Sequence, residues 1–405
     1  NRAHHADIGA DSPGSMPIDR CLQDEGLLIT PTLLVKADAL QSAVLDGVIA
    51  ATHSPLITEG DFSAQISANR TGVRRVQALI TELGVSGYLQ GISEINAYGE
   101  RMAQAAFKQL PDGDYYFKDV MDDDGQGNQD IGLQVCVSIR DHRVSVDFSG
   151  SAPQTEGNIN CPLSVTAAAV YYVFRCLMDE RTPACAGSFR YIEISAPAGC
   201  LVNALPPAAV VAGNVETSSR IVDLILGSLA AAVPDQIAAA SQGTMNNLAM
   251  GSRVAGAEWD YYETMGGGMG AGPEADGLSA VQTHMTNTLN TPIEVLESNY
   301  PLRICRYALR DNSGGAGWHC GGDGLIREFE FLAPTTVTLL TERRSHMPWG
   351  LHGGDDGRYA DSASASARSR SAPSPCHVLP CMQARVVGDS PARRSSISRV
   401  FGQCE

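Results

Sequence analysis

Lysine is almost missing from this sequence of 405 residues. The three that occur, Lys36, Lys108 and Lys118, do not follow a glycine-rich loop. A phosphate-binding loop of the Walker type needs a lysine at the end of its glycine loop to reach the β- and γ-phosphates. The sequence therefore predicts that the chain has no such loop of its own.

Basic residues are outnumbered by acidic ones, and long apolar runs are lacking. The net charge of -16 would repel the phosphate backbone of a nucleic acid and an anionic membrane surface. No apolar run approaches the ~18–20 residues that a membrane-spanning helix needs, and the stretch IVDLILGSLAAAV is interrupted by Asp223. We therefore expect neither nucleic acid nor membrane as a partner.

Regularly spaced cysteines are lacking too. Eleven cysteines are scattered along the chain without CxxC pairs, and a chain of this length does not need disulfides to stabilise its core. We therefore expect reduced thiols in a cytoplasmic protein. With 43% apolar residues, 18% charged residues and 41 glycines, the composition is typical of a globular protein with many tight turns.

Residues 62–83 and 89–110 repeat apolar side chains every three or four positions, and Gly84 separates them, which predicts a helical hairpin. Residues 131–139 and 144–148 instead alternate apolar and polar side chains on either side of an Asp-His turn. That alternation predicts two antiparallel strands.

Further along, residues 163–178 and 216–233 are typical of buried helices, the second with Thr217 or Ser218 as its cap. Between residues 281 and 340 short β-rich runs alternate with glycine clusters. Together these patterns predict a mixed α+β fold with a helical hairpin and antiparallel β-sheets, in a large subunit with a single core or two lobes.

The first residues carry a candidate metal site. In AHHAD, His4 and Asp7 lie three positions apart and can present one nitrogen and one oxygen to the same ion, a combination that suits zinc, manganese or iron. Asp24 and Glu25 are nearby acids that could complete the set. Two ligands alone do not make a site, and the alternative is that these are ordinary polar loop residues.

Two other motifs are better explained as turns. Asp122, Asp124 and Gln126 occupy the first, third and fifth places of a calcium loop, but Leu133 stands at the twelfth place, where a bidentate glutamate is needed. We therefore expect an acidic turn between strands. The glycine run at 266–272 is expected to form a close backbone turn, although amides exposed by such a loop can also hold an oxyanion.

Acid–base and nucleophilic chemistry have one candidate each. His284 lies in the polar segment QTHMTNTLNTP and is a candidate catalytic residue, because an imidazole transfers protons near neutral pH. The alternative is a structural histidine. Cys161 has no obvious partner histidine in the sequence, and no GxSxG motif occurs, so nucleophilic catalysis has little support.

Many segments, in order, resemble one family. The stretches NRAHHADIG, GDFSAQISANRTGVRRV, FSGSAPQTEGNINCPLSVTAAAVYY, SQGTMNN, YYETMGGGMGAGP, THMTNTLNTPIEVLE and SGGAGWHCGGDGLIREFEFL are together similar to the hydantoinase B/oxoprolinase family. We interpret residues 1–354 as a hydantoinase B-like region. The family has a further region before AHHAD, so the resemblance implies that the sequence is truncated at its N-terminus.

Residues 355–405 differ from the rest of the chain. From Arg358 onward there are seven arginines against three acidic residues, ten serines and no apolar period. Such a composition predicts a disordered tail, and a frame shift in GC-rich DNA would also produce it. The resemblance implies a glycine-rich strand at the end of the chain, which is not found there, and this favours the frame shift.

The resemblance also implies a function. Members of the family are catalytic subunits that act with a hydantoinase A-type partner, and the resemblance implies that this partner binds ATP and Mg and phosphorylates the substrate oxygen. The implied substrate is a small cyclic amide such as hydantoin, N-methylhydantoin or 5-oxoproline, and the implied assembly is a hetero-oligomer. In the carboxylase relatives an H-x-x-D pair contributes to a metal site, which here corresponds to His4 and Asp7.

Two alternatives to a hydrolase follow from the same residues. One is a subunit of an ATP-dependent ketone carboxylase, which is implied by the same resemblance. The other is an inactive truncated remnant.

Overall fold

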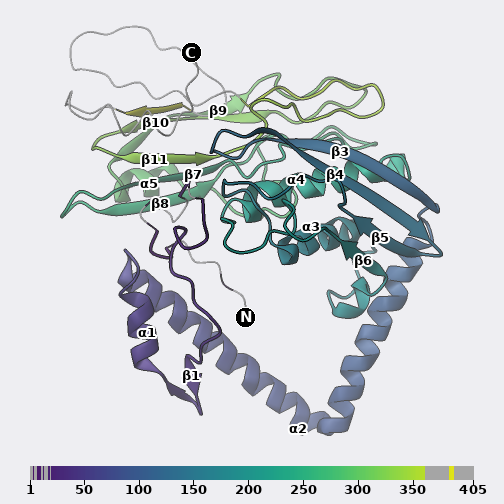
Figure 1. The fold of residues 1–405 in the computed structure, drawn as a ribbon, viewed down its shortest axis with the longest axis horizontal. Coiled ribbons are helices and arrows are strands. Elements are labelled where there is room, and N and C mark those ends of the chain that lie inside the picture. Colours follow the sequence, from purple (N-terminus) through teal and green to yellow (C-terminus); the bar gives the residue numbers. More distant parts are fainter. Residues whose placement is uncertain are drawn as a thin grey trace.

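The computed structural model describes residues 3, 7–10, 12, 17–18 and 20–360, together with the backbone of residues 383–386. Its helices are α1 (Ser42–Ile49), α2 (Pro55–Phe107), α3 (Leu163–Cys176), α4 (Ser218–Leu229) and α5 (Ile293–Asn299). Its strands are β1 (Val35–Lys36), β2 (Ala39–Leu40), β3 (Gly113–Asp123), β4 (Gln129–Arg140), β5 (Arg143–Asp147), β6 (Ile192–Ser195), β7 (Asn247–Ser252), β8 (Trp259–Thr264), β9 (Leu302–Arg310), β10 (Gly324–Phe331), β11 (Thr336–Leu340) and β12 (Gln383–Val386). In Figure 1, β3–β6 lie on one side of α3 and α4 and the remaining large sheets lie on the other, while α2 projects below both.

The four-stranded sheet has the order β3-β4-β5-β6. Buried and more exposed residues alternate along β4 and β5, so the predicted strand period is confirmed. Between these strands Asp141 and His142 have φ values of 48° and 66°, the left-handed conformation that a two-residue hairpin turn requires at both positions. The β5–β6 pair is parallel, and the other two pairs are antiparallel.

Helix α4 packs on β3 and β4, and α3 packs on α4. Both helices occur where the apolar runs predict them. The expected side-chain cap at Thr217 or Ser218 is wrong, because residues 213–217 already form a π-helical turn that leads into α4. Thr217 therefore has helical backbone angles, and the Ser218 hydroxyl donates backwards to the carbonyl of Asn214 at 2.6 Å.

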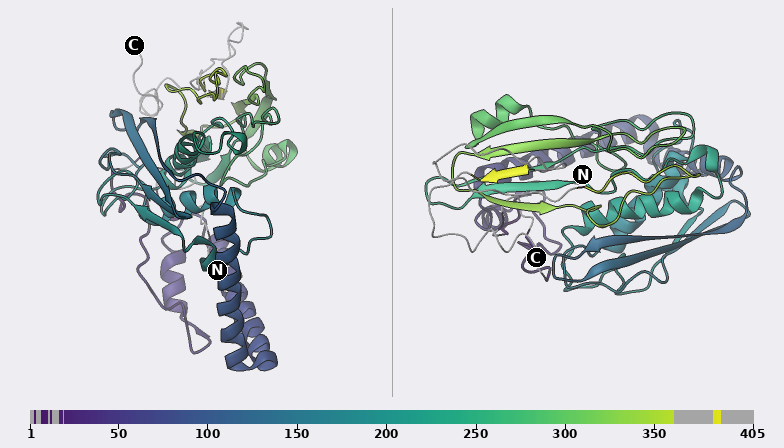
Figure 2. Two further views of the ribbon diagram at one scale, coloured as in Figure 1. Left: turned by 90° about the vertical axis from the view of Figure 1, so that its right-hand side faces the viewer. Right: turned by 90° about the horizontal axis from the view of Figure 1, so that it is seen from above.

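The other sheets form a second lobe with its own core. Strand β7 pairs antiparallel with β8 and β11, and β10 pairs antiparallel with β9 and parallel with β12. The buried side chains of this lobe are those of Leu248, Met250, Tyr261, Met265, Leu296, Leu302, Phe329 and Phe331. Seen from above in Figure 2, these strands run beside α3 and α4. The predicted mixed α+β fold, with two cores, is therefore confirmed.

Helix α2 is bent at Gly84, where φ is 70° and ψ is 160°. Its two halves diverge from that residue as the arms of a V (Figure 1), so the predicted hairpin is an open one. The end of the second arm joins the main core through Ala103 and Phe107, and the Phe107 ring packs edge-on against that of Phe174 at 5.7 Å. The main contacts of α2 with other elements are with α1 and with residues 186–189.

Within the part of the chain that the structure describes, no helix is both long and apolar enough to cross a bilayer. The prediction that residues 355–405 form a disordered or frame-shifted tail falls mostly on residues outside the described ones. Of residues 361–405, the structure describes only the backbone of β12.

Candidate active site

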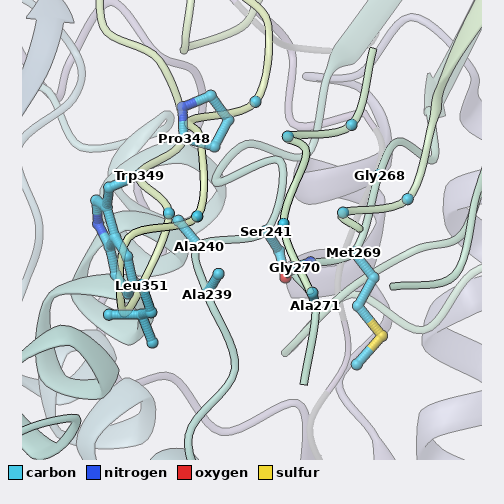
Figure 3. A pocket seen from close by; sticks show the side chains of 18 of the residues that line it. Ala239, Ala240, Ser241, Gly268, Met269, Gly270, Ala271, Pro348, Trp349 and Leu351 are labelled. Carbon is cyan, nitrogen blue, oxygen red and sulfur yellow. Dashed lines mark hydrogen bonds between the residues drawn. The ribbon is translucent and has the colours of Figure 1, made fainter. Parts of the chain in front are cut away.

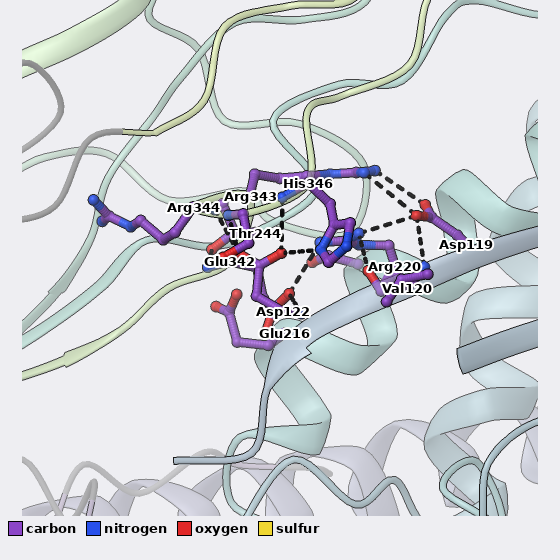
Figure 4. A network of polar contacts seen from close by, with 12 residues as sticks. Asp119, Val120, Asp122, Glu216, Arg220, Thr244, Glu342, Arg343, Arg344 and His346 are labelled. Atoms are coloured by element: carbon purple, nitrogen blue, oxygen red, sulfur yellow. Dashed lines mark hydrogen bonds and ion pairs between the residues drawn. The ribbon is translucent and has the colours of Figure 1, made fainter. Parts of the chain in front are cut away.

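A group of charged side chains is buried between the two lobes, where β3, α4 and the segment after β11 meet (Figure 4). We call it the buried charge cluster, and its members are Asp119, Asp122, Glu216, Arg220, Asp223, Glu342 and Arg343. Residues that are far apart in the sequence are thus brought together in the interior.

Two arginines hold the cluster together. Arg220 places Nη1 at 3.2 Å from Oδ1 of Asp119 and Nη2 at 3.0 Å from Oε2 of Glu342. Arg343 places Nη2 at 3.2 Å from Oδ2 of Asp119 and at 2.9 Å from Oδ2 of Asp223. Because removal of one partner from a buried ion pair leaves an uncompensated charge, these contacts fix the relative positions of β3, α4 and the segment after β11.

The cluster contains more carboxyl groups than arginines, and their pKa values diverge. Burial raises the pKa of Glu342 well above its ordinary value and that of Glu216 to about 7. Burial also acts to raise the pKa of Asp122, but hydrogen bonds from the His346 ring and from nearby backbone N–H groups outweigh it and hold that pKa below its ordinary value. The cluster therefore combines carboxyl groups whose pKa is raised with a carboxyl group whose pKa is lowered.

His284, the residue expected to be catalytic, lies against this cluster. Its Nε2 is 3.1 Å from Oδ1 of Asp223, and the side chain of Asp223 is fully buried. Burial acts to raise the pKa of Asp223, but the hydrogen bond to His284 and the charge of Arg343 hold that pKa below its ordinary value. An ionised aspartate fixes the orientation of the imidazole and stabilises its protonated form, which is how a histidine is prepared to act as a base.

The imidazole of His284 is held from a second side by the ring of Tyr172, whose centroid lies 6.0 Å away. No described residue donates to or accepts from Nδ1 of His284. The backbone of His284 has φ 54°, a conformation that is uncommon outside glycine and tends to occur at functional sites. Nδ1 therefore remains available for a hydrogen bond.

The sequence did not reveal the partner of His284. Asp223 lies in the middle of an apolar helix, where an unpaired carboxylate would be costly, and that cost is the signal that a buried cation or imidazole must face it. The sequence does not predict that His284 is the partner of Asp223, because the two residues are separated by 61 positions.

The glycine run 266–272 forms close backbone contacts. A Cβ atom on Gly268 would stand 2.0 Å from the carbonyl oxygen of Gly322, and one on Gly270 would stand 1.9 Å from that of Ala239. The amides of Gly267, Met269, Gly270 and Gly272 all donate to acceptors within the chain. The expected close turn is therefore confirmed, and these four amides are already used.

A cavity of about 550 Å³ lies beside these glycines (Figure 3). Its walls come from residues 234–246, 267–273, 310–324 and 343–360. Figure 3 places Trp349 and Leu351 on one wall and Met269 on the opposite one. The volume is within the range of ~300–1,000 Å³ that is usual for small-molecule sites.

Three lining residues of the cavity carry buried polar atoms without hydrogen-bond partners. These are both amide atoms of Gln242, Nε1 of Trp349 and Nε of Arg343. Buried polar groups are nearly always paired in folded proteins, so these three residues beside the cavity are exceptions. Arg343 also belongs to the buried charge cluster, and Asp223 links it to His284.

Of the expected metal ligands, His4 lies outside the described residues and Asp7 lies among them. Oδ1 of Asp7 accepts the N–H of Gly9 at 3.0 Å and Oδ2 accepts that of Ser54 at 2.7 Å, while Nδ1 of His53 lies 3.6 Å from Oδ1. Carboxylate and imidazole suit the metals considered above. Sequence reasoning missed His53 because 46 positions separate it from Asp7.

The other two acids near Asp7 have different contacts. Asp24 accepts a hydrogen bond from the thiol of Cys21 at 2.9 Å. Glu25 is buried and accepts the N–H groups of Val210 and Val211, each at 2.7 Å. Among the described residues no group of three or more metal-ligating side chains is found, so Asp7 and His53 form an incomplete pair there.

Two further candidates are structural. Burial raises the pKa of Cys161 to about 12, so this residue is a thiol at neutral pH and not a nucleophile. Oδ1 of Asp124 accepts the backbone N–H groups of Gln126 at 2.9 Å and Asn128 at 3.1 Å. The acidic turn predicted between strands is therefore confirmed between β3 and β4.

The sequence model described as Hydantoinase B/oxoprolinase matches residues 1–387 of this chain. The chain belongs to the hydantoinase B/oxoprolinase family. It is 37% identical to 5-oxoprolinase 1 of Arabidopsis thaliana over 388 residues, which cover 88% of this chain and 29% of that protein. It is 34% identical to a D-/L-hydantoinase subunit of Pseudomonas sp., with coverage of 89% and 63%.

Solved structures also resemble this member of the hydantoinase B/oxoprolinase family. The ATP-dependent caprolactamase of Pseudomonas jessenii is similar with a TM-score of 0.78 and 26% identity, over 90% of this chain and 62% of that one. Acetone carboxylase in its nucleotide-free form has a TM-score of 0.71 at 19% identity, over 80% of this chain and 46% of that one. The chain thus spans less than two thirds of each of these relatives.

Proposed function

We propose that this chain is the hydrolytic subunit, or the hydrolytic part, of an ATP-dependent hydrolase that opens a small cyclic amide. The observation that carries the proposal is the His284–Asp223 pair, which Arg343 connects to a cavity of small-molecule size in a chain of this family. Oxoproline, hydantoin and caprolactam, which appear in the names of the relatives, are all cyclic amides. The proposed location is the cytoplasm.

A hydantoinase A-type partner supplies ATP chemistry in this proposal. An unactivated amide is a poor electrophile, and phosphorylation of its oxygen makes the carbonyl carbon reactive. The proposed partner binds ATP and Mg and carries out that step. The scarcity of lysine and the absence of a Walker motif in this sequence support such a division between two subunits.

His284 is the proposed general base. A water molecule attacks the phosphorylated carbonyl carbon, a C–O bond forms, and the water proton passes to Nδ1 of His284. The charge of Asp223 stabilises the resulting imidazolium. The tetrahedral intermediate then collapses with cleavage of the ring C–N bond, and the leaving nitrogen takes the proton from His284. Hydrolysis of the resulting acyl phosphate by a second water releases phosphate and leaves the ring-opened acid.

The cavity beside Arg343 is the proposed place of the amide, with Trp349 and Leu351 against its ring. His284 and Asp223 are not among the residues that line this cavity, so the proposal requires the attacking water to lie between Nδ1 of His284 and the amide.

A divalent metal, zinc, manganese or iron, is proposed to be held by His4, Asp7 and His53. The donor set fits, because the described part already places an imidazole nitrogen 3.6 Å from a carboxylate oxygen. A bound divalent ion supplies Lewis-acid polarisation of an oxygen. Asp7 also anchors the N-terminus of α2 through the Ser54 N–H, so the same carboxylate orders the loop that carries His53.

The test is reconstitution with an A-type partner. The chain and the partner are mixed with ATP and, separately, with 5-oxoproline, hydantoin and caprolactam, and both ADP and the ring-opened product are measured. His284→Gln is expected to lower the rate of ring opening ~10²–10⁴-fold, the usual contribution of a general base. His142→Asn in the β4–β5 turn is the matched control and should keep full activity. Unchanged ring opening by His284→Gln would disprove the assignment of the base.

The ketone carboxylase is distinguished in the same assay. Acetone carboxylase resembles this chain at 19% identity, which supports a shared fold and not a shared reaction. Incorporation of labelled bicarbonate into a ketone, without ring opening of any amide, would favour the carboxylase. Absence of both reactions with every partner tried would favour an inactive remnant.

A further inference from the structure

Both arms of α2 expose apolar side chains, and one such surface lies on the first arm. Val73, Val76, Leu79 and Leu83 are 56%, 38%, 46% and 52% exposed, and Ile80 is half-buried. The arm projects away from the sheets, as Figure 2 also shows. These five side chains, which we call the α2 stripe, are therefore exposed or half-buried.

The spacing of the α2 stripe is that of a helix-packing surface. Its members follow one another at steps of three, three, one and three residues, so all five lie on one side of a helix with 3.6 residues per turn. An apolar stripe that continues along a helix for more than two turns usually packs against another helix. A contiguous apolar patch on a surface marks an interaction site.

Two charged residues border the stripe on the side of Leu79. Arg75 and Glu82 are seven positions apart, so they lie two turns from each other on the same edge. Both are exposed, and neither forms an ion pair with another described residue. A second α2 stripe, running antiparallel with a two-fold axis beside residues 78 and 79, would place each Arg75 opposite the other copy's Glu82.

We propose that the α2 stripe is the dimer interface of this protein, in which the first arms of α2 from two copies pack antiparallel around that axis. The apolar side chains meet in the centre, and two symmetric Arg75–Glu82 pairs flank them and set the direction and register. A parallel two-fold pair would put the Arg75 and Glu82 residues of the two copies on opposite sides of the interface, so the antiparallel arrangement is the one that brings each Arg75 beside a Glu82.

Light scattering on the whole chain tests the proposal, and the wild-type protein should have the mass of a dimer. Val76→Glu should give a monomer, because it puts a charge in the centre of the stripe. Arg75→Glu and Glu82→Arg should each weaken dimerisation about tenfold or more, since two attractive pairs become repulsive. Arg74→Glu is the matched control: it makes the same charge change one residue away, on the side of the helix opposite the stripe, and should leave the dimer intact.

The decisive measurement uses mixtures. Arg75→Glu mixed with Glu82→Arg should form a dimer, because both pairs between the two chains are then attractive, and the double variant Arg75→Glu/Glu82→Arg should dimerise alone. A monomeric wild-type chain would overturn the proposal. The proposal would also be overturned if neither the mixture of single variants nor the double variant formed a dimer. If Val76→Glu in that case also lost binding of the A-type partner, the α2 stripe would be the binding site of that partner. Circular dichroism of each variant shows that loss of the dimer is not loss of the fold.

Discussion

Glu216 allows a quantitative test of the buried charge cluster. Its side chain is fully buried at the start of α4, where Oε1 accepts the amide of Asn247 at 2.6 Å and the N–H of Met245 at 3.2 Å, while Oε2 has no partner. The perturbation is Glu216→Gln, which keeps the size of the side chain and an oxygen for both donors but removes the acidic proton.

The size of the effect follows from the pKa of Glu216. Burial raises it from the ordinary 4.5 to about 7, and one pKa unit corresponds to about 1.4 kcal/mol of differential stabilisation. The folded state binds this proton more tightly than the unfolded state, so the contribution of Glu216 to stability is full below pH 4.5 and is lost as the pH rises through 7. The loss amounts to about 3 kcal/mol as an upper value.

The assay compares unfolding midpoints of the two proteins at pH 5 and pH 8. Relative to the wild type, Glu216→Gln should be more stable at pH 8 than at pH 5 by up to about 2.5 kcal/mol, because part of the loss has already occurred at pH 5. The comparison cancels the titration of groups that do not interact with Glu216. The charge of Glu216 helps to raise the pKa of Glu342, so the titration of Glu342 changes with the substitution. A difference in stability between variant and wild type that is the same at both pH values would refute the reasoning, since it would mean that Glu216 ionises normally inside the protein.

Three other outcomes are expected. The chain without a partner should release no phosphate from ATP, and turnover by a preparation free of other ATPases would contradict the assignment of ATP binding to the partner. Metal analysis of the enzyme assembled with its partner should find about one divalent ion per chain, and Asp7→Ala or His53→Ala should remove it. Variants that retain both metal and activity would show that Asp7 is a structural residue. Ala239→Trp should fill the cavity and raise KM at least tenfold with the fold kept, and an unchanged KM would place the substrate elsewhere.

The fold was largely predictable because local patterns dictate it. Alternation in residues 131–139 and 144–148 specifies strands with one buried face, and the apolar run that contains Asp223 specifies a buried helix. The divergence of the two arms of α2 was not predictable. Gly84 permits a positive φ, but only contacts with the rest of the molecule decide the direction of the chain after it.

The candidate site was predictable in part. His284 was identified by its residue type, whereas Asp223 and Arg343 became visible only through contacts across 61 and 120 positions. His53 was missed for the same reason. Long-range pairs of this kind leave no periodic signal in the sequence, because each member is chosen by a partner from another element and not by its own neighbours.

The glycines around the cavity also constrain how the protein can change. A side chain on Gly268 would collide with the main chain at residue 322, and one on Gly322 would collide with the main chain at residue 278. Main-chain atoms cannot be moved aside by a rotamer change, so these parts of the wall cannot be rebuilt by substitution. Diversification of substrate preference in descendants of this sequence must then occur through the few adjustable side chains, above all Met269 and Trp349.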